Sequence, residues 1–279
     1  MKRLVKYPVI TSLTGVIVKE MKIMSRYIGT LVIVISLPYM LSGFFIGVGY
    51  TVGGEAAARN FYMNTGVENP LLYLTLGGTL MMISMFLIEN TSGIIREEQL
   101  IGTFELHYLT PNNTILLWFF HAVASSLLFL GVFAVNVSLV IAVAGSLLNP
   151  YEWLLAFIIV SLGILPLAGL GLVVAALTVR FKEVWAVANI VSSFIAMLSG
   201  FYYPLEVFPR VVQLVAQVVP TSHASELLKK IVSGMHTQLP LAERLTLMGV
   251  LALGYLALGK VFYSRWEDDA RKKGELSKY

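Results

Sequence analysis

Long apolar stretches separated by short polar gaps dominate this chain. A helix needs about 17–25 apolar residues to cross roughly 30 Å of hydrocarbon, and six stretches come near or exceed that length. They predict an all-α integral membrane protein with six transmembrane helices. The stretches are Ile28–Val48, Leu71–Ile95, Ile115–Leu147, Trp153–Val179, Val184–Ser199 and Leu245–Phe262.

Basic residues gather in alternate gaps between these stretches. Fifteen of the 20 Lys and Arg residues lie before the first stretch, after the second and fourth, or from residue 260 onward, at and beyond the end of the sixth. Because Lys and Arg favour the cytoplasmic side, the pattern predicts a multi-pass protein of the cell membrane with both termini cytoplasmic. The opposite gaps hold the other five, which are Arg59, Arg210, Lys229, Lys230 and Arg244.

The composition agrees with a membrane protein and excludes some chemistry. Only 13% of the residues are charged, about half the share found in soluble domains. Cysteine is absent, which excludes disulfides, thiol catalysis and cysteine-ligated metals. Topology explains the excess of basic residues, so no nucleic-acid partner is expected.

Residues 1–27 are predicted to form an amphipathic helix at the membrane interface, ahead of one six-span domain over residues 28–279. Apolar residues recur at spacings of three and four, as one helical face requires. Basic residues on another face would meet lipid phosphates. The apolar stripe is Ile10, Leu13, Ile17, Met21 and Met24, and the basic face is Lys19, Lys22 and Arg26. A solvated helix packed on the rest of the protein is the alternative.

Residues 96–111 form the longest polar stretch between two spans on the predicted cytoplasmic side. Glu97, Glu98 and Glu105 are acidic where cations are usual. Gln99–Tyr108 is expected to form a short helix that Thr110 and Pro111 end. Acidic residues in such a helix do not favour lipid binding, so we expect docking onto a cytosolic protein. An ordinary solvated loop is the alternative.

Residues 200–234 are predicted to enter the outer leaflet and return as a re-entrant helical hairpin between spans five and six. Gly200, Pro204 and Pro209 break the fifth helix. The apolar run that follows would rise only about 14 Å as a helix, which is too short to cross. Such an element needs protein or water around its backbone, which indicates a translocation pathway or a gate. A surface hairpin that caps the fold is the alternative.

Few charges lie within the spans, so the predicted pathway is apolar with sparse polar or aromatic groups. The candidates are His121, Asn136, Asn189, Ser193, Gly200, Tyr202, Tyr203 and Pro204. Hydrogen bonds between helices and interface anchoring are alternatives for each side chain. An apolar path suits a hydrophobic drug or lipid, whereas aromatic rings near the exit would also suit a lipid-linked polysaccharide.

Other classes of protein find little support in the sequence. An ion-coupled carrier usually places charged sites near the middle of the membrane, and no clear charge lies there. The zinc-protease and serine-hydrolase motifs are absent and the four histidines are scattered. Asp268 and Asp269 lie in a cationic tail and indicate a solvated charge run rather than a metal site. We therefore expect no catalytic residue and no metal.

Two motifs resemble those of the permease subunits of type-2 ATP-binding-cassette (ABC-2) exporters. The first, between spans two and three, reads Glu97-Glu98, then Gly102-Thr103-Phe104-Glu105, then Thr110-Pro111. The second, after span five, reads Ser199-Gly200-Phe201-Tyr202-Tyr203-Pro204, then Phe208-Pro209, then Pro220-Thr221-Ser222-His223. With the N-terminal helix and six spans, the resemblance covers nearly the whole chain.

The resemblance implies a permease that works as a dimer of two copies or paralogues, with a cytosolic ATPase beneath each. Residues 97–107 would be the coupling helix seated in a groove of the ATPase. The residues implied in coupling are Arg96, Glu97, Glu98, Gly102, Thr103, Glu105, His107 and Pro111. The chain lacks a phosphate-binding loop, so ATP and Mg²⁺ are expected on the partner and no cofactor on this chain.

Overall fold

The computed structural model of this chain describes residues 9–109, 113–145, 148–181, 184–233 and 240–273. Over these residues the fold is all-helical, with 11 α-helices, one short 3-10 helix and no strand. The elements are α1 (Val9–Arg26), α2 (Ile28–Gly53), α3 (Ala56–Thr65), α4 (Pro70–Leu100), α5 (Phe104–Leu109), α6 (Thr114–Ala144), α7 (Pro150–Phe181), α8 (Val184–Leu198), η1 (Leu205–Val207), α9 (Arg210–Ala216), α10 (Pro220–Ser233) and α11 (Leu241–Lys273).

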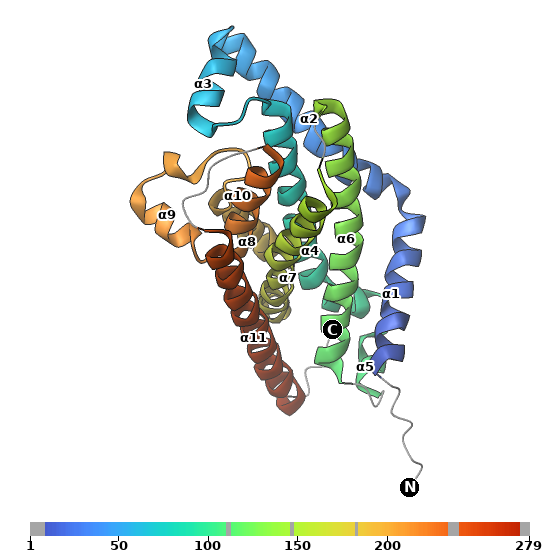
Figure 1. Cartoon of the computed structure of the whole chain (residues 1–279). Coiled ribbons are helices and arrows are strands. Elements are labelled where there is room, and N and C mark those ends of the chain that lie inside the picture. Colours follow the sequence, from blue (N-terminus) through green and yellow to red (C-terminus); the bar gives the residue numbers. More distant parts are fainter. Residues whose placement is uncertain (1–8, 110–112, 146–147, 182–183, 234–239, 274–279) are drawn as a thin grey trace.

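Helices α4 and α7 form the centre of a bundle in which most long helices run along a similar direction (Figure 1). Apolar side chains of α4, including Leu80, Ile83 and Leu87, are fully buried against α6, α7 and α10. Helices α2 and α11 lie at the periphery and are mostly exposed. Helix α3 lies at one end of the bundle and α5 at the other, and we call these the α3 end and the α5 end.

Glycines bring α7 close to its neighbours, as expected for small residues in packed membrane helices. A Cβ at Gly169 would lie 2.2 Å from the Tyr255 carbonyl oxygen of α11, and one at Gly171 would lie 2.5 Å from Thr91 of α4. On the other side, Gly259 of α11 packs against the backbone of Gly169. These glycines therefore let the backbones of α4, α7 and α11 approach closely.

Five of the described helices are long and apolar enough to cross a membrane, namely α2, α4, α6, α7 and α11. They confirm five of the six predicted spans as long apolar helices. Helix α8, in the stretch predicted as span five, is shorter than these five helices. It has 15 residues and rises only about 22 Å. The prediction that the third stretch reaches Leu147 is corrected, since Gly145 ends α6 in a left-handed conformation.

The predicted N-terminal helix exists as α1, which packs along α6 (Figure 1). Leu13, Ile17 and Met24 are half-buried, whereas Ile10 and Met21 are exposed. The apolar stripe is thus divided between the bundle and the surroundings of the protein.

The predicted break after the fifth stretch is confirmed. Gly200 has φ 61°, a left-handed conformation that glycine adopts without strain. Short elements follow, because η1 begins after Pro204, α9 after Pro209, and Pro220 opens α10. Helix α10 is almost entirely buried, whereas α9 is largely exposed. The re-entrant path itself stays a prediction, and residue 234 lies outside the described residues.

The short helix predicted over Gln99–Tyr108 needs correction. Helix α4 continues to Leu100, so Gln99 belongs to its last turn. Gly102, at φ 72°, then turns the chain and α5 begins at Phe104. The turn before α5 therefore comes later in the chain than predicted, because the amphipathic end of α4 stays helical beyond the apolar stretch.

Candidate functional site

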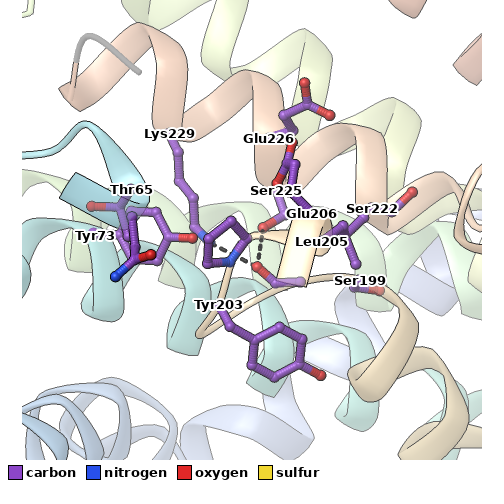
Figure 2. Close-up of a pocket in the computed structure, with 13 residues that line it drawn as sticks. Thr65, Tyr73, Ser199, Tyr203, Leu205, Glu206, Ser222, Ser225, Glu226 and Lys229 are labelled. Atoms are coloured by element: carbon purple, nitrogen blue, oxygen red, sulfur yellow. Dashed lines mark hydrogen bonds between the residues drawn. The ribbon is translucent and has the colours of Figure 1, made fainter. Parts of the chain in front are cut away.

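A small polar cavity lies at the α3 end, beside the break between α8 and η1 (Figure 2). Its volume is about 140 Å³. Ser199 and Gly200 come from the break, Glu226 and Lys229 from α10, and Tyr73 from α4. Asn64 and Thr65 of α3 also line it, so the cavity lies where four separate segments meet.

Lys229 is 2% exposed and points at the backbone of the break. Its Nζ donates to the carbonyl oxygens of Gly200 and Phe201, both at 2.8 Å. The same Nζ lies 3.7 Å from the centre of the Tyr73 ring, within the range of a cation–π contact. Burial lowers the pKa of Lys229 well below its ordinary value, while Glu206 and Glu226 act in the opposite direction.

A second buried cation, Arg244 of α11, ties α11 to α10 at the α3 end. It lies 2.7 Å from Nδ1 of His223 and 2.7 Å from a carboxylate oxygen of Glu226. His223 Nε2 lies 2.9 Å from the Gln217 carbonyl oxygen, so this nitrogen donates and Nδ1 accepts. Burial lowers the pKa of His223, which favours this neutral form.

The α5 end buries carboxylates instead. Among the described residues three carboxylates are buried, and all of them lie there: Glu20 of α1, Glu98 of α4 and Glu267 of α11. Buried charges are costly unless they are paired and hydrogen-bonded. Each of the three therefore needs partners, and other helices provide some of them.

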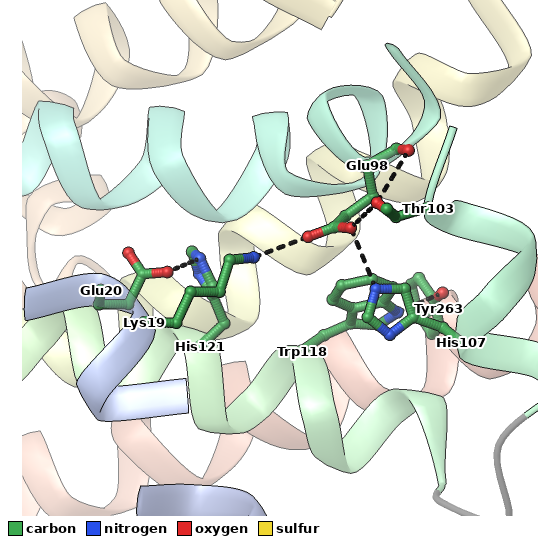
Figure 3. Close-up of polar contacts among 8 residues, drawn as sticks. All are labelled: Lys19, Glu20, Glu98, Thr103, His107, Trp118, His121 and Tyr263. Carbon is green, nitrogen blue, oxygen red and sulfur yellow. Dashed lines mark hydrogen bonds and ion pairs between the residues drawn. The ribbon is translucent and has the colours of Figure 1, made fainter. Parts of the chain in front are cut away.

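Glu98 joins three segments (Figure 3). One carboxylate oxygen accepts from Lys19 Nζ of α1 at 2.7 Å. The other lies 3.1 Å from His107 Nε2 of α5 and accepts from the hydroxyl of Thr103 in the turn. Because charge-assisted hydrogen bonds are stronger than neutral ones, α1, α5 and the end of α4 are held as one unit.

Further polar contacts join this unit to α6 and α11. Glu20 of α1 lies 2.7 Å from His121 of α6 (Figure 3). Trp118 of α6 donates to the Tyr263 hydroxyl of α11 at 2.7 Å. Thr114 of α6 donates to Glu267 at 2.9 Å. We call Glu98, Lys19, His107, Thr103, Glu20 and His121 the Glu98 network.

The outer surface of the turn and α5 is apolar with acidic neighbours. Four large apolar side chains are 55–80% exposed there, and we call them the α5 patch: Leu100, Ile101, Leu106 and Leu109. Arg96, Glu97 and Glu105 are exposed beside them. Clustered exposed apolar side chains of this kind indicate an interaction surface.

The predicted coupling residues therefore divide by position. Arg96, Glu97 and Glu105 face outward, whereas Glu98, Thr103 and His107 bond to one another inside. Gly102 provides the left-handed turn between α4 and α5. Pro111 lies outside the described residues. Lys19, predicted for the lipid-facing side of α1, bonds to Glu98, while Lys22 and Arg26 are exposed.

The predicted pathway residues do not converge on one cavity. Asn189 and Ser193 are exposed and line a groove along α8 with Ile190, Phe194 and Met197. His121 and Asn136 are buried on α6, where Tyr39 of α2 donates to the Asn136 carbonyl oxygen. Gly200, Tyr202, Tyr203 and Pro204 lie at the break, and the Tyr203 hydroxyl donates to the Met197 carbonyl oxygen.

Several residues at these sites escaped the sequence analysis. Gly77 and Gly78 of α4 leave room for the break to pack against this helix. A Cβ at Gly77 would lie 1.7 Å from the Phe201 carbonyl oxygen, and one at Gly78 would lie 2.7 Å from the Tyr202 hydroxyl. A pair of glycines within a long apolar stretch is the signal for such a contact. The sequence singled out Lys229 only as a basic residue in a predicted outer gap, although Thr221, Ser225 and Lys229 follow one another at four-residue spacing, which indicates one helical face.

A comparison with protein families gives one match. The model described as "ABC-2 family transporter protein" matches residues 58–260, which is well over half of the chain and runs from α3 into α11. No curated protein matches the sequence.

Proposed function

Because the chain belongs to the ABC-2 transporter family, we propose that it is the permease subunit of an ATP-driven exporter. Two such subunits work together, and a separate cytosolic ATPase beneath each supplies the energy. ATP and Mg²⁺ bind to that partner. The proposed substrate is a hydrophobic drug or a lipid-like molecule that moves outward.

The observation that carries this proposal is the combination of the α5 patch with the Glu98 network behind it. The patch offers apolar and acidic side chains to a soluble partner. The network joins the segment that bears the patch to α1 and α6. A displacement of α5 by an ATPase would therefore move these helices with it, which is what coupling requires.

Orientation follows from the same assignment. The α5 end is proposed to be cytoplasmic and the α3 end external, in agreement with the distribution of basic residues in the sequence. Helix α1 then lies at the inner interface, where Lys22 and Arg26, both exposed, meet lipid phosphates. The short helix α8 completes the proposed set of six spans together with the break that follows it.

The exposed face of α8 supports a dimer. Asn189 and Ser193 are polar groups on an apolar membrane helix, and such groups normally face protein rather than lipid. We assign this face to the contact with the second subunit, so that the groove along α8 borders the pathway. Ile190, Phe194 and Met197 make the groove mainly apolar, which favours a hydrophobic substrate over a glycan.

Transport into inside-out membrane vesicles tests the proposal. Vesicles with the chain and its ATPase should accumulate a hydrophobic fluorescent dye when ATP is added and lose this ability when the ATPase is omitted. Ionophores that collapse ion gradients should leave the rate unchanged. Uptake that follows an ion gradient and ignores ATP would overturn the proposal in favour of a secondary transporter.

A further inference from the structure

One face of α10 is polar and lies directly on the break after α8. Thr221, Ser225 and Lys229 are four residues apart, and each is at most 2% exposed. Thr221 bonds to the Ser199 hydroxyl, Ser225 donates to the Gly200 carbonyl oxygen, and Lys229 donates to the carbonyl oxygens of Gly200 and Phe201. The three side chains thus contact successive residues of the break, and Figure 2 shows Ser225 and Lys229 among them.

The carbonyl groups at this break have no regular helical partners. A helix leaves its last carbonyl groups unsatisfied, and Gly200 turns the chain away from the α8 axis with φ 61°. Buried carbonyl groups in an apolar bundle require other donors. The long stem of Lys229 brings N–H groups to two of these carbonyl oxygens at once, which a shorter side chain at the same position does not reach.

The opposite side of the break rests on α4. The Phe201 carbonyl oxygen lies where a Cβ of Gly77 would stand, so the break touches the backbone of α4. Tyr73, one turn earlier on α4, places its ring beneath Lys229 Nζ. Lys229 therefore contacts both the break and α4, the helix on which the break rests.

We propose that Lys229 is a positioning residue that holds the α8–η1 break against Gly77 of α4 and so sets the closed arrangement of the α3 end. This inference rests on the proposed function only in treating the α3 end as the exit of the transport pathway. The assignment rests on the hydrogen bonds from Lys229 Nζ to the carbonyl oxygens of Gly200 and Phe201. Their donors are retained in Lys229→Arg and removed in Lys229→Met.

The absence of native cysteine permits a direct test. Leu205 is half-buried and packs against Gly200, so a single cysteine in Leu205→Cys reports separation of the break. We would measure its rate of reaction with a charged maleimide in the purified full chain in detergent. Two further single-cysteine proteins serve as references: Val207→Cys at an exposed position and Ser92→Cys at a buried position far along α4.

Lys229→Met should raise the reaction rate at the Leu205 position about tenfold, and Lys229→Arg should keep it within about twofold of the parent. Lys230→Met, the neighbouring lysine on the same helix, is the matched control and should change nothing. The rates at the Val207 and Ser92 positions should stay constant, which separates a local release from general loosening of the fold.

Two results would overturn the inference: an unchanged rate in folded Lys229→Met, or an equal rise at the Ser92 position. Should Lys229→Met fail to fold, Gly77→Ala decides, because its Cβ displaces the Phe201 carbonyl group while Lys229 remains. Gly77→Ala should also accelerate the reaction at the Leu205 position, and an unchanged rate there would refute the packing of the break against α4. These assays need no ATPase and no substrate, so their outcome does not depend on whether the proposed function is correct.

Discussion

The two ends of the bundle bury charges of opposite sign. The α5 end buries the carboxylates of Glu20, Glu98 and Glu267, whereas the α3 end buries Lys229 and Arg244 among the described residues. At the α5 end the carboxylates take side-chain partners from several helices. At the α3 end Lys229 bonds to backbone oxygens of one break. Side-chain bonds thus link several helices at the α5 end, whereas the bonds of Lys229 hold a local segment at the α3 end.

The same contrast explains two exceptions to the rule that Lys and Arg favour the cytoplasmic side of a membrane protein. Two of the five basic residues in the predicted outer gaps, Lys229 and Arg244, are buried and bonded rather than free surface charges. At the α5 end, carboxylates are buried while Lys22 and Arg26 remain exposed. Burial therefore removes three carboxylates from the surface of that end, although Glu97 and Glu105 stay exposed. A count of basic residues alone does not show this.

The largest expected effect comes from reversing the charge of Glu98. Glu98→Lys places a third positive or protonatable group beside Lys19 and His107 and should cost about 3–5 kcal/mol of stability, as for a broken buried pair. Thermal unfolding in detergent measures this loss. The matched control is Glu105→Lys, which changes an exposed carboxylate and should leave the unfolding temperature within experimental error. Equal destabilisation by both would remove the distinction between inner and outer residues of the segment.

The break should respond next most strongly. Gly200→Leu forces a side chain into a left-handed conformation beside Leu205 and the Tyr203 carbonyl oxygen, at a cost of about 1–3 kcal/mol. The variant should insert into membranes yet transport poorly. Gly249→Leu is the control, because a Cβ there meets open space. Normal transport by Gly200→Leu would favour a passive surface hairpin.

The α5 patch should behave as a docking surface. Leu106→Asp should weaken binding of the ATPase by about 2 kcal/mol, roughly 30-fold in Kd, because buried apolar anchors dominate interfaces. Co-purification with the ATPase measures it. Met63→Asp, at an even more exposed apolar position at the α3 end, should have no effect. If both variants retain the ATPase equally, the α5 patch is not its docking site.

The smallest effect concerns acid pH at the α3 end. Burial lowers the pKa of His223 in the folded state, so its contribution to stability is present above about pH 6.5 and is lost as the pH falls. Protonation would place an N–H against Arg244. His223→Asn keeps an acceptor for Arg244 and should reduce the acid-induced fall in unfolding temperature by an amount worth about 1 kcal/mol. An identical pH dependence in the variant would contradict the neutral form of His223.

The sequence predicted those features that depend on local pattern. Hydropathy located the five long spans, and Gly200, Pro204 and Pro209 located the break. Helix α8 ends at Leu198, one residue before the predicted end of the fifth stretch. The start of α5 was misplaced because the last polar turn of α4 remains helical.

The Glu98 network lay beyond sequence reasoning, since its partners are far apart in the chain. Lys19 and Glu98 are separated by 79 residues, and the neighbouring pair of Thr114 and Glu267, outside this network, by 153. No periodicity links such pairs. The charges of Glu97, Glu98 and Glu105 appeared equivalent in sequence, and only packing shows that Glu98 faces inward while the other two face out. Lys229 was hidden in the same way among five apparent exceptions.

The central claim is that a separate ATPase drives this permease through the α5 end. The most direct test is to purify the tagged chain from its native membranes, determine which proteins accompany it and reconstitute the product into liposomes. The account predicts an ATPase subunit in the complex and transport that requires ATP. A chain that purifies without any ATPase and still moves solutes would contradict it.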